Sequence, residues 1–111
     1  MWTFIAYIIY RLCEEKGKNV IRLDELYKLF FDVFWRECKL ALVDSKNELL
    51  DKLRYLEALG ALRIKGDRIE VNMREIKSIA SIVENSTLKS ELLIYRMYIS
   101  RIEEGIRKMS I

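Results

Sequence analysis

The segment that most constrains the fold of this chain is residues 1–12, with the sequence MWTFIAYIIYRL. Residues 2–16 are expected to form a helix that is apolar on almost every face and turns polar only at Glu14–Lys16. A helix of this kind has to be covered by other elements on most of its sides. The apolar run is too short to span a bilayer, no basic residue precedes it, and no small-residue cleavage site follows it. We therefore expect a buried helix in a cytoplasmic protein that does not contact a membrane.

The composition predicts one globular domain, 1–111. Hydrophobic residues make up 51% of the chain and charged residues 33%, which is typical of a folded protein and not of a disordered one. A chain of 111 residues can build one core but has little room for a second. His, Pro and Gln are absent, and low Gln with many Lys and Glu is typical of hyperthermophiles. We therefore expect a thermophilic, archaeal source, although a short chain can also lose residue types by chance.

The two cysteines, Cys13 and Cys38, give no indication of a metal site. They form no closely spaced pair, and the chain has no His to complete a zinc site. We expect two buried free thiols. A disulfide is the alternative, because intracellular proteins of hyperthermophiles do contain them.

Two further helices follow the first. Asp24 and Glu25 are expected to open a helix that runs to about Cys38, because acidic residues suit the positive start of a helix. Its aromatic residues outside the core stripe are candidates for an additional interface: Tyr27, Phe31 and Trp35. The best-defined helix covers residues 45–59, where Ser45 and Glu48 form a capping box and Gly60 ends the helix.

The second half of the chain predicts a hairpin and more helix. Apolar and charged residues alternate over 62–71 on both sides of Gly66-Asp67, which is typical of a β-hairpin. Residues 19–22 form a short extended segment, and Asn72 with Glu75 predicts the cap of another helix. Residues 85–87 interrupt the helical spacing, so a separate last helix is expected after them.

The segment from about Val20 to Asn72 resembles the winged-helix superfamily of small DNA-binding regulators. Three stretches carry the resemblance: Leu23-Asp24-Glu25-Leu26, the Leu-rich end of the 45–59 helix up to Leu62, and the Gly66-Asp67 hairpin. The resemblance implies a mainly α fold with a small β wing, in which a winged helix-turn-helix core (20–72) carries an added N-terminal helix (1–17) and a long C-terminal helix within 73–111. Such additions are similar to those of dimeric archaeal and viral members. Winged helices also serve as protein-binding modules.

In this family resemblance, residues 45–58 correspond to the recognition helix. A spacing of 100° per residue turns the Leu face inward and Asn47, Asp51, Arg54, Tyr55 and Ala58 outward. Asn suits adenine and Arg suits guanine, so Asn47 and Arg54 are expected to read base edges. The residues expected to hold phosphates or to lie beside the minor groove are Lys46 and Tyr55 on the helix and Arg63, Lys65 and Arg68 on the wing.

The charge distribution leaves a second function open. The net charge is only +3, and residues 44–58 carry four acidic and three basic residues. Asp44, Glu48 and Asp51 share the exposed side of the helix, where a carboxylate repels phosphate. The alternative to a double-stranded DNA-binding transcriptional regulator is therefore a winged-helix protein-interaction module, such as a subunit or adaptor of a larger complex.

A homodimer is expected from the last helix. Apolar residues repeat there with alternating spacings of four and three, which is typical of a coiled-coil seam: Leu88, Leu92, Tyr95, Ile99, Ile102, Ile106 and Met109. A helix of about 22 residues is roughly 33 Å long, more than one side of the remaining domain. Part of the stripe is therefore expected to meet a second chain, with the first helix as its neighbour.

No pattern in the sequence indicates catalysis. The chain has no His for acid–base work, and its four glycines do not cluster into a phosphate-binding loop. Neither cysteine lies in a nucleophile motif. We expect a protein that is not an enzyme and that needs no cofactor.

Overall fold

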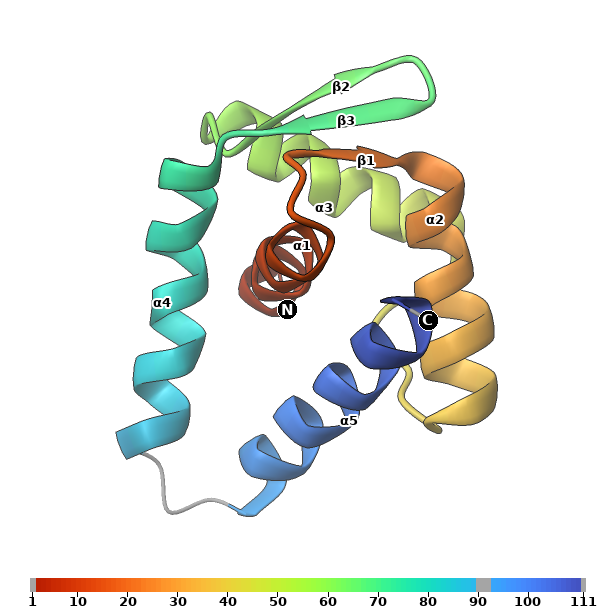
Figure 1. The fold of residues 1–111 in the computed structure, drawn as a ribbon, viewed down its shortest axis with the longest axis vertical. Helices are drawn as coiled ribbons and strands as arrows, with labels where there is room; N and C mark the ends of the chain where they lie inside the picture. The colour runs from red at the N-terminus through yellow and green to blue at the C-terminus, as the bar shows by residue number, and fades with distance from the viewer. Residues whose placement is uncertain (1, 90–92, 111) are drawn as a thin grey trace.

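The structure is a computed structural model that describes the backbone of residues 2–89 and 93–110 and the side chains of 2–85 and 96–109. It is mainly α, with one small antiparallel sheet (Figure 1). The elements in chain order are α1 (Trp2–Lys16), β1 (Val20–Arg22), α2 (Leu23–Tyr27), the π-helix η1 (Lys28–Glu37), α3 (Lys46–Ala58), β2 (Leu62–Lys65), β3 (Arg68–Val71), α4 (Met73–Lys89) and α5 (Leu93–Ser110). This order is compatible with a winged-helix-like fold.

Helix α1 lies in the middle of the molecule, as its apolar sequence predicts. In Figure 1 it is seen nearly end-on, with α4, α5, α3 and the sheet placed around it. Helices α3, α4 and α5 all pack on it. Ile5, Ile8 and Ile9 are fully buried, and so is Leu12 one turn further on. The α1 helix is therefore the common surface on which the other helices assemble.

The three strands are arranged in the order β1-β3-β2. Ile21, Ile69 and Ile64 lie opposite one another across the sheet, and Ile21 and Ile69 are buried on its inner face. The Leu23 N–H donates to the Asp67 carbonyl at one end, and the Val71 N–H donates to the Asn19 carbonyl at the other, both at 2.7 Å. The hairpin is thus held along its whole length by β1 and does not project freely.

The expected start of α3 is confirmed, with a small change in the partner of Glu48. Ser45 Oγ accepts from the Glu48 N–H at 3.1 Å, and the Glu48 carboxylate accepts from the Asp44 N–H at 2.7 Å. The leucines at 49, 53 and 56 are fully buried. The cap before α4 is also present, because Asn72 Oδ1 accepts from the Glu75 N–H at 3.3 Å.

Two predicted helices differ in detail from the structure. The second helix ends near Cys38 as expected, but most of it is the π-helix η1, which closes with a bond from the Cys38 N–H to the Val33 carbonyl. The predicted break at 85–87 is wrong, because α4 continues to Lys89 and α5 begins only at Leu93. Asn, Ser and Thr are weak helix formers, but neither Gly nor Pro stands there to stop the helix.

The apolar stripe of α5 packs largely on its own chain. Ile102 and Ile106 are fully buried against the core, so they have no surface left to offer a second chain. Ile99 and Met109 are partly buried against the same core. The other three residues of the predicted seam, Leu88, Leu92 and Tyr95, lie outside the described side chains.

The contact between α5 and η1 depends on Gly105. A Cβ built on Gly105 would lie 2.6 Å from Phe34 Cδ1 and would also overlap Cε1 of the same ring. Phe34 is fully buried and packs edge-on against Phe30, with 5.4 Å between the ring centroids. The phenyl ring is therefore held in place, and only glycine lets the two helices approach this closely.

One ionic cluster joins α1 to α5. Arg11 Nε donates to Glu103 Oε1 at 2.8 Å, Arg11 Nη2 donates to Oε2 at 3.0 Å, and Tyr7 Oη donates to Oε1 at 2.7 Å. Partial burial alone would raise the pKa of Glu103, but the hydrogen bonds from Arg11 and Tyr7 outweigh burial and lower it. The pKa of Tyr7 is raised by burial and by the neighbouring Glu103 carboxylate.

We expect the substitution Gly105→Ala to destabilise the protein. Because alanine has a higher helix propensity than glycine, propensity alone would raise the free energy of unfolding by about 1 kcal/mol. Forcing a methyl group against the Phe34 ring lowers it by about 1–3 kcal/mol. Chemical denaturation followed by circular dichroism measures the difference. Ser100→Ala, an exposed position on the same helix, is the control and should leave the stability unchanged or slightly higher. If Gly105→Ala were as stable as the unaltered protein or more stable, the close approach of α5 to η1 would be contradicted.

Glu103→Gln should lower the free energy of unfolding by about 1–2 kcal/mol at pH 7, because a charged acceptor is lost from Arg11 and Tyr7. The folded pKa of Glu103 lies below its unfolded value of about 4.3, so this stabilisation is present above that pH and is lost as the pH falls through the folded pKa. Denaturation measured from pH 7 to pH 3 should show the two proteins converging. Glu104→Gln, an exposed neighbour, is the control. A difference that does not change with pH would rule out this role for Glu103.

Candidate nucleic-acid interface

The outer face of α3 has the composition expected from the sequence. Asn47, Arg54 and Tyr55 are exposed, as are Asp51 and Lys46. The opposite face carries the buried leucines, which fix the rotation of the helix against the core. The structure thus places the predicted base-reading and phosphate-holding residues of α3 at the surface.

Several of these side chains already have partners within the chain. Arg54 pairs with Asp51 at 3.8 Å, and Lys46 Nζ lies 4.9 Å from the ring centroid of Tyr27. The ring of Tyr55 contacts the ring of Trp2 edge-on, with centroids 5.1 Å apart. An exposed ion pair such as Arg54–Asp51 contributes little to the free energy of folding and rearranges easily. The helix surface is therefore available, but it is not strongly positive.

The second group of predicted residues lies on the sheet. Arg63, Lys65 and Arg68 are exposed on its outer face. The register also places Arg22 of β1 directly opposite Arg68, which the sequence analysis missed. The sequence Asn19-Val20-Ile21-Arg22 has no alternation of polar and apolar residues that could have identified it, and pairing of β1 with the hairpin is a tertiary feature. The outer face of the sheet is therefore richer in cations than predicted.

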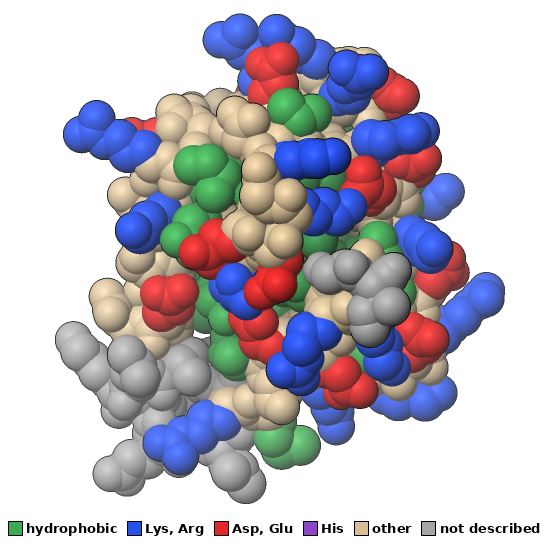
Figure 2. Space-filling view, viewed as in Figure 1, with side chains coloured by type: hydrophobic (Ala, Val, Ile, Leu, Met, Phe, Trp, Pro, Cys, Tyr) green, Lys and Arg blue, Asp and Glu red, His purple; other side chains and the backbone are tan. Residues whose placement is uncertain are grey.

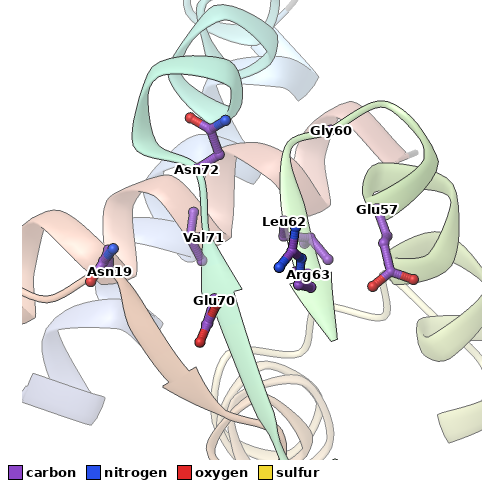
Figure 3. A pocket seen from close by; sticks show the side chains of 8 residues that line it. All are labelled: Asn19, Glu57, Gly60, Leu62, Arg63, Glu70, Val71 and Asn72. Carbon is purple, nitrogen blue, oxygen red and sulfur yellow. The ribbon is translucent and has the colours of Figure 1, made fainter. Parts of the chain in front are cut away.

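The sheet and α3 meet along β2, which packs on the helix. Glu57 Oε2 accepts from the Ile64 N–H at 2.7 Å and joins the two elements. Beside this contact lies an open hollow, shown in Figure 3 and lined by Asn19, Glu57, Gly60, Leu62, Arg63, Glu70, Val71 and Asn72. Its lining mixes two carboxylates, a guanidinium and two amides, so it has no single charge character. Arg63 stands at the border between the sheet and the end of α3.

The surface as a whole is a patchwork of charges. Figure 2 shows acidic side chains among the basic ones over most of the visible face, while Lys and Arg gather at the top, where Figure 1 places the sheet. Helix α3 itself carries three acidic and three basic residues, and Asp44 just before it adds one more acid. The sheet therefore contributes several of the cations in this view, with acidic side chains among them.

Apolar side chains are exposed at a few other places. Trp35 on η1 has an exposed fraction of 57%, and Phe31 is partly buried against the core. Tyr27 lies near Phe31, with 6.5 Å between the ring centroids. Of the three aromatics expected outside the core stripe, Trp35 is thus the one with most of its surface open.

The two cysteines lie in the interior of the protein. Cys13 and Cys38 are both buried and carry free thiols. Burial raises the pKa of the Cys13 thiol to about 12, which keeps the thiol protonated near neutral pH. Among the described residues, no group of three or more potential ligands could hold a metal ion.

Comparison of the chain with protein-family models, with curated proteins and with solved structures found no match. Within the described part of the chain, no helix has both the length and the apolar character needed to cross a membrane.

Proposed function

We propose that this chain is a double-stranded DNA-binding protein of the winged-helix type, acting as a transcriptional regulator, with residues 20–72 as its binding unit. The observation that carries the proposal is the set of exposed cations Arg63, Lys65 and Arg68 on the outer face of the sheet, beside the strand that packs on α3. The chain order of strand, helix pair, hairpin and the sheet order β1-β3-β2 support it.

The outer face of the sheet and the outer face of α3 have different roles in this proposal. Phosphate contacts supply most of the affinity, and base contacts supply sequence preference. The sheet cations hold phosphates, and α3 enters the major groove with Asn47 and Arg54 toward the base edges. Arg54 has to leave Asp51 to do so, which costs little because both side chains are mostly exposed.

The DNA proposal is tested by titrating random duplex DNA at low salt and following a mobility shift. With about 4–8 phosphate contacts, log K should fall against log salt with a slope of about −4 to −7. Arg54→Ala should cost about 1–3 kcal/mol on a preferred site and relax base preference, while Lys65→Ala should weaken all sequences alike. Asp51→Asn should tighten binding, because it removes a carboxylate that would face phosphate.

Lys77→Ala is the control for this titration, because Lys77 is exposed on α4, outside the 20–72 unit. It should bind as the unaltered chain does. Absence of binding at tens of micromolar protein would exclude DNA as the partner.

A second candidate function is a protein-interaction module, and the outer face of α3 favours it. Residues 44–58 carry one more acid than base, and Tyr55 on α3 and Leu59 directly after it are exposed at 48% and 45%. Aromatic and apolar side chains of this kind are typical of the centre of protein interfaces. A titration in which no variant binds DNA would leave this adaptor function as the better explanation.

We also propose that the chain forms a homodimer, although not through the middle of the α5 stripe. Ile102 and Ile106 are used within the chain, so the interface has to be built from other surface, such as exposed Met97 and Trp35. Sedimentation should give about twice the 13.3 kDa chain mass. Trp35→Lys, which places a charge on that surface, should shift the equilibrium toward the monomer. Arg36→Glu, at the next exposed position, is the control, and a monomer at high protein concentration would refute the dimer.

A further inference from the structure

We propose that a row of three cations across the outer face of the sheet, Arg22 on β1, Arg68 on β3 and Lys65 on β2, holds the phosphodiester backbone of one nucleic-acid strand. This inference rests on the proposed function and deepens it in two ways. It adds Arg22, which lies outside the recognition helix and outside the hairpin. It also arranges the sheet cations into one row that follows a single nucleic-acid strand.

The row follows from the strand register. Arg22 lies opposite Arg68 in the β1–β3 pair, and Arg68 lies opposite Lys65 in the β3–β2 pair. The neighbouring row of isoleucines faces the core, and successive residues of a strand point to opposite faces. The three cations therefore point to the outer face, where all three are exposed.

This arrangement has an electrostatic cost in the free protein. Like charges directly opposite each other on paired strands destabilise a sheet. Arg22 is partly compensated by Asp24 and Lys65 by Glu70, each at 3.2 Å. Arg68, in the middle, has a cation on both sides and no acidic partner within 4 Å among the described residues. A bound polyanion would remove this repulsion.

The spacing of the row fits a nucleic-acid backbone. Neighbouring strands lie about 4.7–4.9 Å apart, so three strands span about 10 Å. A nucleic-acid strand carries one charge per 3.4 Å of helix axis and also winds around that axis, so its neighbouring phosphates are about 7 Å apart and about two of them face the row. Arginine can also hold a phosphate with two parallel N–H donors. The acids beside Arg22 and Lys65 are in exposed pairs, which exchange for phosphate at little cost.

The composition of this face favours a nucleic acid over an acidic protein. The centre of a protein interface is usually depleted in charge and enriched in aromatic residues. The described outer face of the sheet has four cations, including Arg63, together with Glu70 and the single apolar side chain of Val20. It offers charge in a regular row and no aromatic anchor.

The test measures stability without ligand and affinity with DNA for the variants Arg22→Gln and Arg68→Gln. Arg68→Gln should raise the melting temperature by about 1–4 °C at low ionic strength, because repulsion is relieved. The gain should shrink at high salt, where exposed charges are screened. Each variant should weaken duplex DNA binding about eightfold at 0.1 M salt and make the salt slope shallower by about 0.9, the value for one phosphate contact.

Arg36→Gln is the matched control, because Arg36 is a highly exposed arginine on η1 and not on the sheet. It should change neither affinity nor salt slope. If the unaltered chain binds DNA and both sheet variants bind like this control, the row is wrong and the proposed function stands. If the unaltered chain binds neither duplex nor single-stranded DNA, both are wrong. Binding of poly-glutamate with the same dependence on Arg22 and Arg68 would overturn the nucleic-acid assignment in favour of an acidic protein.

Discussion

The burial of α1 is the constraint on which the rest of the molecule depends. Each fully buried Ile or Leu contributes about 1.5–3 kcal/mol, and α1 has several of them on different faces. A single neighbouring helix cannot cover such a surface, so α3, α4 and α5 all pack on it. Because these helices turn their apolar faces toward α1, the sheet and the outer side of α3 are left to face solvent, and with them the cations available for binding.

Local signals in the sequence were enough to predict much of this arrangement. Ser45 and Glu48 marked the start of α3, and the alternation around Gly66 marked the hairpin, because each depends on atoms only a few residues apart. The uniform apolar character of α1 predicted its burial without any knowledge of its partners. The exposed positions on α3 followed from helical spacing once the leucines were assigned to the core.

Features that depend on contacts between distant segments could not be predicted in this way. The spacing of four and three in α5 was interpreted as a dimer seam, but the same spacing also suits packing on a core, and Ile102 and Ile106 are used there. Gly105 does not lie in a turn: it leaves room for the ring of Phe34, which a Cβ at this position would overlap. Arg22 became a candidate binding residue only when the register placed it opposite Arg68. In each case the deciding partner lies far away along the chain.

The central position of α1 has a consequence for synthesis. The helix ends at Lys16, whereas α5, which covers part of it, begins at Leu93, 77 positions later. At about 5–20 residues per second, the ribosome takes roughly 4–15 s to make the intervening chain. During that interval α1, one of the most apolar segments of the protein, has already been made, but α5 has not. A chaperone that shields short apolar helices would therefore act on this chain early, on a segment whose isoleucines are buried in the finished molecule.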